Sequence, residues 1–279
     1  MNYRHAFHAG NFADAHKHIA LTAALLLLRK KENPFVVIDT HAGRGVYDLS
    51  ASEAIRTSES AAGIGRLQSF VARSTALNTY LETVRSFGAN TYPGSPLITA
   101  KLLRPQDRLI AIEKHREEFA MLANALKPYA RARAIEADGY DRLLTFLPPP
   151  ERRGLVLIDP PYEEADEFER LARTFAAAYR RFATGIYLLW FPLKLARSVE
   201  ALAGELRNAG AANLLALTLN VGRESATTEG NGLSAAGLLV ANAPYSFDAD
   251  MRDVSAEILP HLRRGGGAGA RVEWLSASH

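Results

Sequence analysis

The chain has 279 residues, a formal net charge of +3 and no cysteine. The lack of cysteine excludes disulfides, thiolate zinc sites and cysteine nucleophiles. The mild basicity, with an isoelectric point near 9.1, is compatible with an anionic partner but does not require one. The longest apolar run near the start, residues 19–28, is too short to cross a bilayer, and no signal-peptide pattern is present. We therefore expect a cytoplasmic protein without membrane contact.

The first part of the chain combines a loop, a helix and a buried strand. Residues 3–14 are polar, aromatic and interrupted by glycine, which predicts a loop. Asp14 can cap a helix that runs to about Lys31, where basic residues suit the helix dipole. The apolar run 35–39 predicts a strand, and residues 40–45 form a glycine-containing turn after it.

Residues 46–92 are different in character, being polar and helical without a clear strand. The sequence 92–96 (YPGSP) predicts a rigid turn, followed by a helix over 97–103. A strand at 109–113 and a helix over about 117–126 restore the earlier pattern. The stretch 46–92 is therefore interpreted as an insertion after the first strand.

The rest of the chain continues this alternation of strands and helices. Further strands are predicted at 133–136, 155–158, 185–190, 213–221, 235–241 and, as an edge strand, 270–275. Further helices are predicted at 140–147, 165–182, 193–209 and 250–262, with a polar loop at 222–234. This pattern is typical of an α/β fold with a mainly parallel sheet and helices on both faces.

A specific motif, Asp159-Pro160-Pro161-Tyr162, closes the apolar run 155–158. Ligands of open parallel sheets bind beyond the carboxyl ends of the strands. The prolines stiffen the turn, so that the carboxylate of Asp159 and the carbonyl of Pro160 can lie side by side and accept both hydrogens of an NH2 group. The ring of Tyr162 can stack on a planar base. The same residues also fit an acidic strand end followed by a proline turn.

Three other strand ends suit a nucleoside cofactor. The turn 39–45, with Gly43, permits close approach to the backbone, yet it matches neither the G-x-G-x-x-G nor the G-x-x-x-x-G-K-[ST] phosphate loop. Glu113 ends the next strand, where an acid can hold ribose hydroxyls, or it is a solvated strand end. Asp138 can accept from the adenine amine of the cofactor, or it caps the helix that starts near Tyr140.

Four histidines, His5, His8, His16 and His18, lie near the start. His16 and His18 are two residues apart and do not share a helix face, and no acidic cluster accompanies them, so we expect no metal. His18 can instead bond a cofactor carboxylate, or it belongs to a solvated helix start. Residues 3–14 are predicted to form a mobile cover over cofactor and target, with Gly10 as its hinge.

Six segments carry a resemblance to a known family, in matching order over nearly the whole chain: 3–11 (YRHAFHAGN), 39–43 (DTHAG), 92–96 (YPGSP), 137–139 (ADG), 152–155 (RRGL) and 181–187 (RFATGIY). Together they resemble the RlmJ family, the adenine-N6 methyltransferases of bacterial 23S ribosomal RNA. The combination of the six is highly specific.

The resemblance implies a Rossmann-like class I methyltransferase domain, residues 1–45 and 93–279, with a helical insertion subdomain over 46–92. It implies S-adenosyl-L-methionine as cofactor, 23S ribosomal RNA as partner, and a monomer. The residues expected to contact the cofactor are His18, His41, Gly43, Ser95, Glu113, Asp138, Gly139 and Asp159. Asp159 resembles the catalytic proton acceptor, and Tyr3, Pro160 and Tyr162 are expected to contact the substrate. The target base must be flipped out of any helix to reach Asp159.

One departure from the family lies at Asn242-Ala243-Pro244-Tyr245, where the family tends to carry Asn-Pro-Pro-aromatic. It could pass for a second catalytic motif, but we interpret it as a turn after a late strand. Basic pairs at 152–153, 180–181 and 263–264 could hold phosphates or be solvated surface. Two alternatives stay open: a DNA adenine-N6 or glutamine-N5 methyltransferase, the latter disfavoured by Asp159, and a non-catalytic RNA-binding module.

Overall fold

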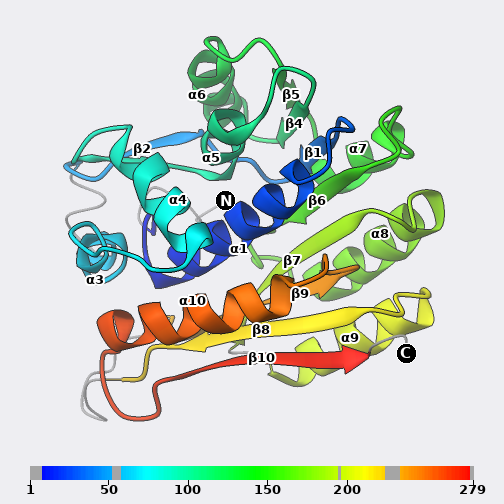
Figure 1. Cartoon of the computed structure of the whole chain (residues 1–279). Helices are drawn as coiled ribbons and strands as arrows, with labels where there is room; N and C mark the ends of the chain where they lie inside the picture. The colour runs from blue at the N-terminus through cyan, green and yellow to red at the C-terminus, as the bar shows by residue number, and fades with distance from the viewer. Residues whose placement is uncertain (1–7, 52–57, 194–195, 224–232, 277–279) are drawn as a thin grey trace.

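The computed structural model describes residues 8–51, 58–193, 196–223 and 233–276. Its main sheet has eight strands in the order β10-β8-β9-β7-β6-β1-β4-β5 (Figure 1). The strands of this sheet are β1 Val36–Asp39, β4 Arg108–Glu113, β5 Ala132–Glu136, β6 Gly154–Ile158, β7 Ile186–Pro192, β8 Leu214–Asn220, β9 Ala235–Ala241 and β10 Gly269–Ser276. The five strands from β7 to β5 run parallel, whereas β9 is antiparallel to both β7 and β8, and β10 is antiparallel to β8. The predicted mainly parallel sheet and its last edge strand are confirmed.

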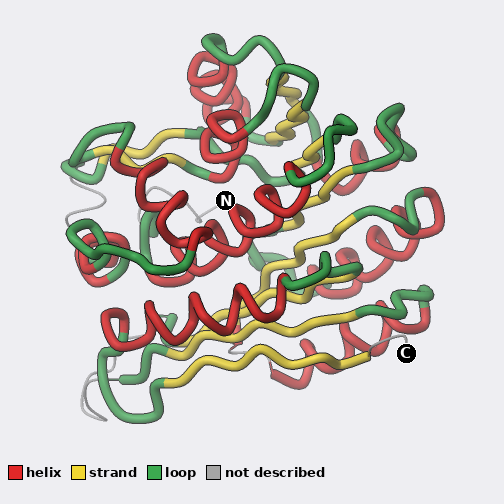
Figure 2. Tube along the Cα trace, in the orientation of Figure 1, coloured by secondary structure: helices red, strands yellow, loops and turns green. Residues whose placement is uncertain are grey.

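Helices cover both faces of this sheet, as predicted (Figure 2). The longer ones are α1 Phe12–Arg29, α4 Thr75–Arg85, α5 Ser95–Leu102, α6 Arg116–Leu126, α8 Glu167–Arg181, α9 Ala196–Asn208 and α10 Phe247–Leu262. α1, α4, α5 and α10 share one apolar core with the sheet, and α8 and α9 share the other with the short helix α7, Gly139–Leu143. Alternate side chains of the central strands enter opposite cores, which is why these strands are apolar at almost every position, whereas the edge strands β5 and β10 also carry exposed charged residues.

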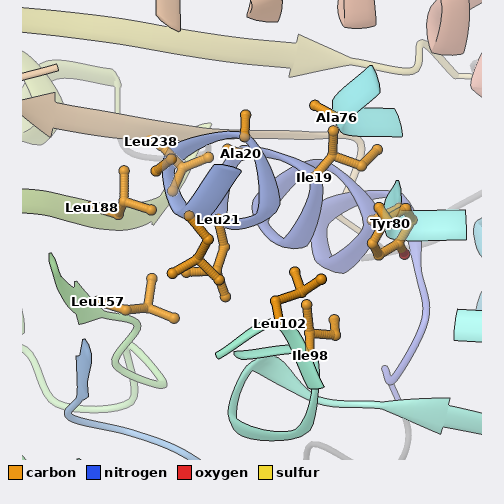
Figure 3. Packing of buried hydrophobic residues seen from close by; sticks show 14 of the residues in the cluster. Ile19, Ala20, Leu21, Ala76, Tyr80, Ile98, Leu102, Leu157, Leu188 and Leu238 are labelled. Atoms are coloured by element: carbon orange, nitrogen blue, oxygen red, sulfur yellow. The ribbon is translucent and has the colours of Figure 1, made fainter. Parts of the chain in front are cut away.

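The central helix of the first core is α1. Figure 3 shows Leu21 of α1 beside Leu157 of β6 and Leu188 of β7. The helix begins at Asn11, whose Oδ1 atom accepts hydrogen bonds from the amides of Ala13 and Asp14, both at 2.9 Å. The prediction that Asp14 is the cap was wrong: Asp14 lies in the first turn, where it accepts hydrogen bonds from the amide of Gly10 and from Lys17.

The prediction that 46–92 lacks a strand was also wrong. β2 Val46–Asp48 and β3 Thr91–Pro93 form a small antiparallel ladder that closes the stretch at its base. With three residues each, they are too short to show a period. Between them lie α3 Glu59–Ala62, the 3₁₀ turn Ile64–Arg66 and α4. The separation of this stretch as a subdomain stays a prediction.

Candidate active site

The parallel strands β1, β4, β5 and β6 place their carboxyl ends side by side, at one end of the sheet. A cavity of about 1240 Å³ lies there, with residues of α1 and the start of α5 in its walls. It brings together all the described residues that were predicted for the site: His18, His41, Gly43, Ser95, Glu113, Asp138, Gly139, Asp159, Pro160 and Tyr162. Tyr3, the predicted RNA contact, lies outside the described residues.

A buried lysine that sequence reasoning missed holds Asp159. The Nζ atom of Lys17 donates to Oδ2 of Asp159, and to Oδ1 of Asp14 at 2.9 Å. Burial alone lowers the pKa of Lys17, but the two carboxylates more than offset it and raise the pKa well above its ordinary value. The only signal in the sequence was the i, i+3 spacing of Asp14 and Lys17, which usually marks a solvated pair.

Asp39, at the end of β1, is a second buried acid beside Asp159. The hydroxyl of Ser95 donates to its Oδ2 atom at 2.6 Å, and its buried Oδ1 atom has no partner among the described residues. Burial raises the pKa of Asp39 to about 7; the Ser95 hydrogen bond opposes this rise and the charge of Asp159 adds to it. Asp39 is not among the residues that line the cavity.

Glu113 shapes the turn after β1. Its Oε2 atom accepts from the amide of Gly43 at 2.9 Å, and its Oε1 atom accepts from the amide of His115 at 2.7 Å. Gly43 has φ +62°, a conformation that favours glycine. Burial raises the pKa of Glu113, and these two amides oppose the rise. Glu113 is only 7% exposed, so the alternative of a solvated strand end was wrong.

Asp138 both caps a helix and lines the cavity. It accepts from the amide of Tyr140 at 3.1 Å, from Arg170 at 2.9 Å and from Lys114 at 3.0 Å. Burial raises its pKa, but Lys114 and Arg170 outweigh burial and lower the pKa overall. The next residue must be glycine, because a Cβ atom on Gly139 would lie 1.9 Å from the backbone oxygen of Thr40, in the turn that follows β1.

One wall of the cavity is an aromatic stack that the sequence did not reveal. The ring of Tyr140 meets the ring of His41 edge-on at 4.8 Å between centroids, and the guanidinium of Arg170 lies 4.5 Å from the same ring. The hydroxyl of Tyr140 donates to buried Glu167 at 2.8 Å. Burial lowers the pKa of His41 to about 4, so its ring is neutral near pH 7.

Tyr162 also lines the cavity, with φ +53°. Its hydroxyl donates to the carbonyl of Trp190 at 2.6 Å, and its ring centroid is 4.9 Å from that of Phe168. These contacts fix the ring at the cavity surface. Trp190 also lines the cavity, and its buried indole Nε1 atom has no partner among the described residues.

Two of the four histidines near the start, His16 and His18, are buried in α1. Nδ1 of His18 lies 2.7 Å from the hydroxyl of Tyr92, deep in the protein, so the alternative of a solvated helix start was wrong. Burial lowers the pKa of His16 to about 4. The predicted hinge Gly10 is tied on both sides, to a carboxylate oxygen of Asp14 and to the amide of Ile64. Over the described ranges, no group of three or more His, Cys, Asp or Glu side chains is placed to bind a metal.

The segment 242–245 follows β9, which runs antiparallel to β7. Ala241 pairs with Tyr187 near the start of β7, so this segment lies at the edge of the sheet opposite to Asp159. The interpretation as a turn after a late strand is consistent with this placement.

Comparisons with known proteins show the family to which this chain belongs. The family model described as "Ribosomal RNA large subunit methyltransferase D, RlmJ" matches residues 32–276. The chain belongs to the RlmJ family. Two relatives, each named "Ribosomal RNA large subunit methyltransferase J", are 37% identical (Escherichia coli) and 36% identical (Haemophilus influenzae), with 99% of both chains covered in each case. The resemblance noted in the sequence is confirmed.

The crystal structure of a Legionella pneumophila protein is similar along almost its whole length. It is 31% identical, with a TM-score of 0.85, and the match covers 96% of this chain and 98% of that one. The Rossmann-like class I methyltransferase fold expected for the family is therefore shown. In the described part of the RlmJ-family chain, no helix is long and apolar enough to cross a membrane.

Proposed function

We propose that this chain transfers a methyl group from S-adenosyl-L-methionine to N6 of one adenine in 23S ribosomal RNA, as a cytoplasmic monomer. The observation that carries the proposal is the placement of Asp159-Pro160-Pro161-Tyr162 in the same cavity as the carboxylates of Glu113 and Asp138. The names of the two relatives support large-subunit ribosomal RNA as substrate. Tyr3 keeps its predicted RNA contact as part of this proposal.

The residues of the cavity fit the cofactor. Glu113 and the Gly43 turn would hold the ribose hydroxyls, Asp138 the adenine amine, and His18 and Ser95 the amino-acid end. The carboxylates of the lining, among them Asp14, Glu113 and Asp159, suit a cationic ligand. When bound, S-adenosyl-L-methionine supplies a methyl group that is already activated on a sulfonium.

The role of Asp159 follows from the chemistry of the adenine amine. The lone pair of N6 is delocalised into the ring. Two oxygen atoms that accept hydrogen bonds from both N–H groups of the amine favour the pyramidal nitrogen that can attack. Lys17 occupies Oδ2 of Asp159, which leaves Oδ1 and the carbonyl of Pro160 as the acceptor pair. As the N–C bond forms, positive charge develops on N6 and Asp159 stabilises it. The surplus N6 proton then passes to Oδ1 of Asp159.

The target base reaches Asp159 only if it leaves its stack, which costs a few kcal/mol. The ring of Tyr162 offers a new stacking surface worth roughly 1–3 kcal/mol, enough to offset much of that cost. The RlmJ-family cavity, at about 1240 Å³, is large enough for two nucleosides side by side.

A methyl-transfer assay separates this proposal from its rivals. Purified protein and S-adenosyl-L-methionine with a labelled methyl group are incubated with unmodified 23S ribosomal RNA, intact ribosomes and duplex DNA. We expect labelling of ribosomal RNA alone or in particles, and nuclease digestion to nucleosides should give N6-methyladenosine. Labelling of DNA in preference to RNA would favour the DNA enzyme, and RNA binding with no transfer would favour a non-catalytic module.

A further inference from the structure

A second hollow, of about 190 Å³, lies along the edge strand β5. It is lined by the start of β4, the start of β5 and a single aromatic ring: Arg108, Leu109, Ile110, Ala130, Arg131, Ala132, Arg133 and Phe146. We call it the arginine groove. Three of its eight lining residues are arginines, an unusual density for a surface whose other members are apolar.

The groove exists because α7 is short. On β4, Ile110 enters the second core, so Arg108, two residues earlier, points to the same face. On β5, Ile135 packs against that core, which places Arg133 and Arg131 on this face as well. α7 has five residues and is continued by the 3₁₀ turn Leu144–Phe146. The last residue of this turn, Phe146, lines the groove together with the arginines.

The guanidinium groups around the groove differ in how they are held. Arg108 forms a two-pronged pair with Glu151, at 2.5 and 3.0 Å. Arg142 lies 5.6 Å from the centre of the Phe146 ring, and Arg181 donates to the carbonyl of Leu144 at 2.6 Å.

Arg131 and Arg133 are exposed and have little to bind within the protein. Arg131 makes one long contact, 3.5 Å, to the carbonyl of Gln106. Arg133 has no side-chain partner among the described residues. The arginines around the groove thus outnumber the one carboxylate among them, Glu151. Two of these arginines, Arg131 and Arg133, are available to bind an anion from outside the protein. Arginine in this state suits phosphate, which it can contact through two parallel N–H donors.

The groove and the catalytic cavity lie at the two ends of one short segment. α7 begins next to Asp138, which lines the cavity, and the 3₁₀ turn that continues α7 ends at Phe146, which lines the groove. At 1.5 Å per residue, this segment spans roughly 12 Å. The groove opens at the starts of β4 and β5 and the cavity at their carboxyl ends, so the groove can meet only RNA that extends beyond the target nucleotide.

The lining of the cavity carries charges of both signs. It includes five carboxylates, Glu117, Glu118, Glu163, Glu164 and Asp166, and four cations, Lys114, Arg116, Arg170 and Arg173. Because the carboxylates offset these cations, further arginines elsewhere on the surface would strengthen the binding of phosphates.

We infer that the arginine groove binds the phosphate backbone of the RNA substrate outside the target nucleotide, with Arg131 and Arg133 as the two phosphate contacts. This inference rests on the proposed function and adds the surface that positions the substrate. It predicts a binding contribution that depends on charge and salt and not on base sequence.

The test compares two double variants with equal loss of charge. Arg131→Gln/Arg133→Gln removes the groove contacts, and Arg207→Gln/Arg271→Gln removes two exposed arginines from α9 and from β10, the other edge strand of the sheet. RNA affinity is measured by fluorescence anisotropy over a series of salt concentrations, and KM and kcat by methyl transfer. Arg131→Lys/Arg133→Lys, which keeps the charge, serves as rescue.

We expect the groove variant to bind roughly tenfold more weakly at low salt, with a log–log salt slope shallower by about 1.4, the value for two contacts to a single strand. KM for RNA should rise while kcat and the affinity for S-adenosylhomocysteine stay unchanged, and the lysine variant should recover most of the loss. Equal effects of the groove and control variants, or an unchanged salt slope, would overturn the inference. Because the wild-type protein is assayed in parallel, failure of the proposed function would show separately, as no methyl transfer at all.

Discussion

Two turns of this RlmJ-family protein look alike in sequence and differ entirely in place. Asp159-Pro160-Pro161-Tyr162 and Asn242-Ala243-Pro244-Tyr245 each follow a buried strand and end in proline and tyrosine. The first follows β6, a parallel strand, and lies in the cavity. The second follows β9, which is antiparallel to β7, and lies at the other edge of the sheet. Strand direction, and not the motif, decides which turn can meet a cofactor.

The polar residue of each turn is used accordingly. Asp159 keeps one oxygen for a substrate, because Lys17 takes the other. The amide of Asn242 is fully occupied: it donates to the carbonyls of Ala183 and Gly185, at 2.7 and 2.8 Å, and accepts from Tyr179 at 3.2 Å. Asn242 has φ +56°, a left-handed conformation that asparagine tolerates better than most residues. The second turn therefore has a structural role, in which Asn242 joins the end of β9 to the segment before β7.

The largest contrast is expected for the polar residues themselves. Asp159→Asn should reduce single-turnover methylation by about a thousandfold, since the amide lacks the charge that stabilises the developing cation. Asn242→Gly, which keeps the left-handed backbone, should leave the rate near that of the wild-type protein. Rates are measured with saturating cofactor, after circular dichroism has shown that both variants are folded. A nearly normal rate for folded Asp159→Asn would remove Asp159 from the mechanism.

The lysine that serves only the first turn should matter next. Lys17→Met leaves two carboxylates, those of Asp14 and Asp159, without their buried cation, and we expect a loss of about 3 kcal/mol in the free energy of unfolding. Lys30→Met, at the exposed end of α1, should change it by less than about 0.5 kcal/mol. Urea denaturation measures both. If the two variants were equally stable, the ion pair would contribute nothing to the fold.

Cofactor binding tests the residues at the carboxyl ends of the parallel strands. Glu113→Ala should weaken S-adenosylhomocysteine binding roughly 10- to 100-fold, because a charged acceptor worth about 1.5–3 kcal/mol is lost together with its support for the Gly43 amide. RNA affinity should not change. Glu117→Ala, an exposed acid of the same cavity, is the control in calorimetry. An unchanged dissociation constant for Glu113→Ala would make this residue purely structural.

The pH dependence of stability tests the burial of Asp39. Its pKa is about 7 in the folded protein and 3.8 as the ordinary value, so the folded state holds the proton more tightly than the unfolded state. Stability is therefore lost as the pH rises from about 4 to 7 and stays reduced above 7. Asp39→Asn removes this dependence. The Tm of the variant, relative to that of the wild-type protein at the same pH, should therefore rise by a few degrees between pH 4 and pH 8. Parallel Tm curves would mean that Asp39 is not protonated preferentially in the folded state.

Much of the fold and part of the site could be predicted from the sequence. The strands of the main sheet appear as apolar runs because both of their faces are buried, and the acids at their ends mark the cavity. β2 and β3 were missed because three residues carry no period, and Asn11 was missed because a nearby Asp14 could equally cap the helix. Lys17 could not be predicted, since only the tertiary structure places a carboxylate from β6 beside it.

The two tyrosines give the finest test of the comparison, because one substitution can be made in both turns. The hydroxyl of Tyr162 donates to the carbonyl of Trp190 at 2.6 Å, whereas Tyr245 is 97% exposed. Tyr162→Phe should lower the free energy of unfolding by about 1 kcal/mol, the usual contribution of one hydrogen bond, while its ring still stacks on the target. Tyr245→Phe should change neither stability nor methylation, since its hydroxyl bonds water in both the folded and the unfolded chain. Urea denaturation and KM for RNA are measured for both variants. A loss of RNA affinity in Tyr245→Phe would show that the turn after β9 also contacts the substrate, and the separation of catalytic and structural turns would fail.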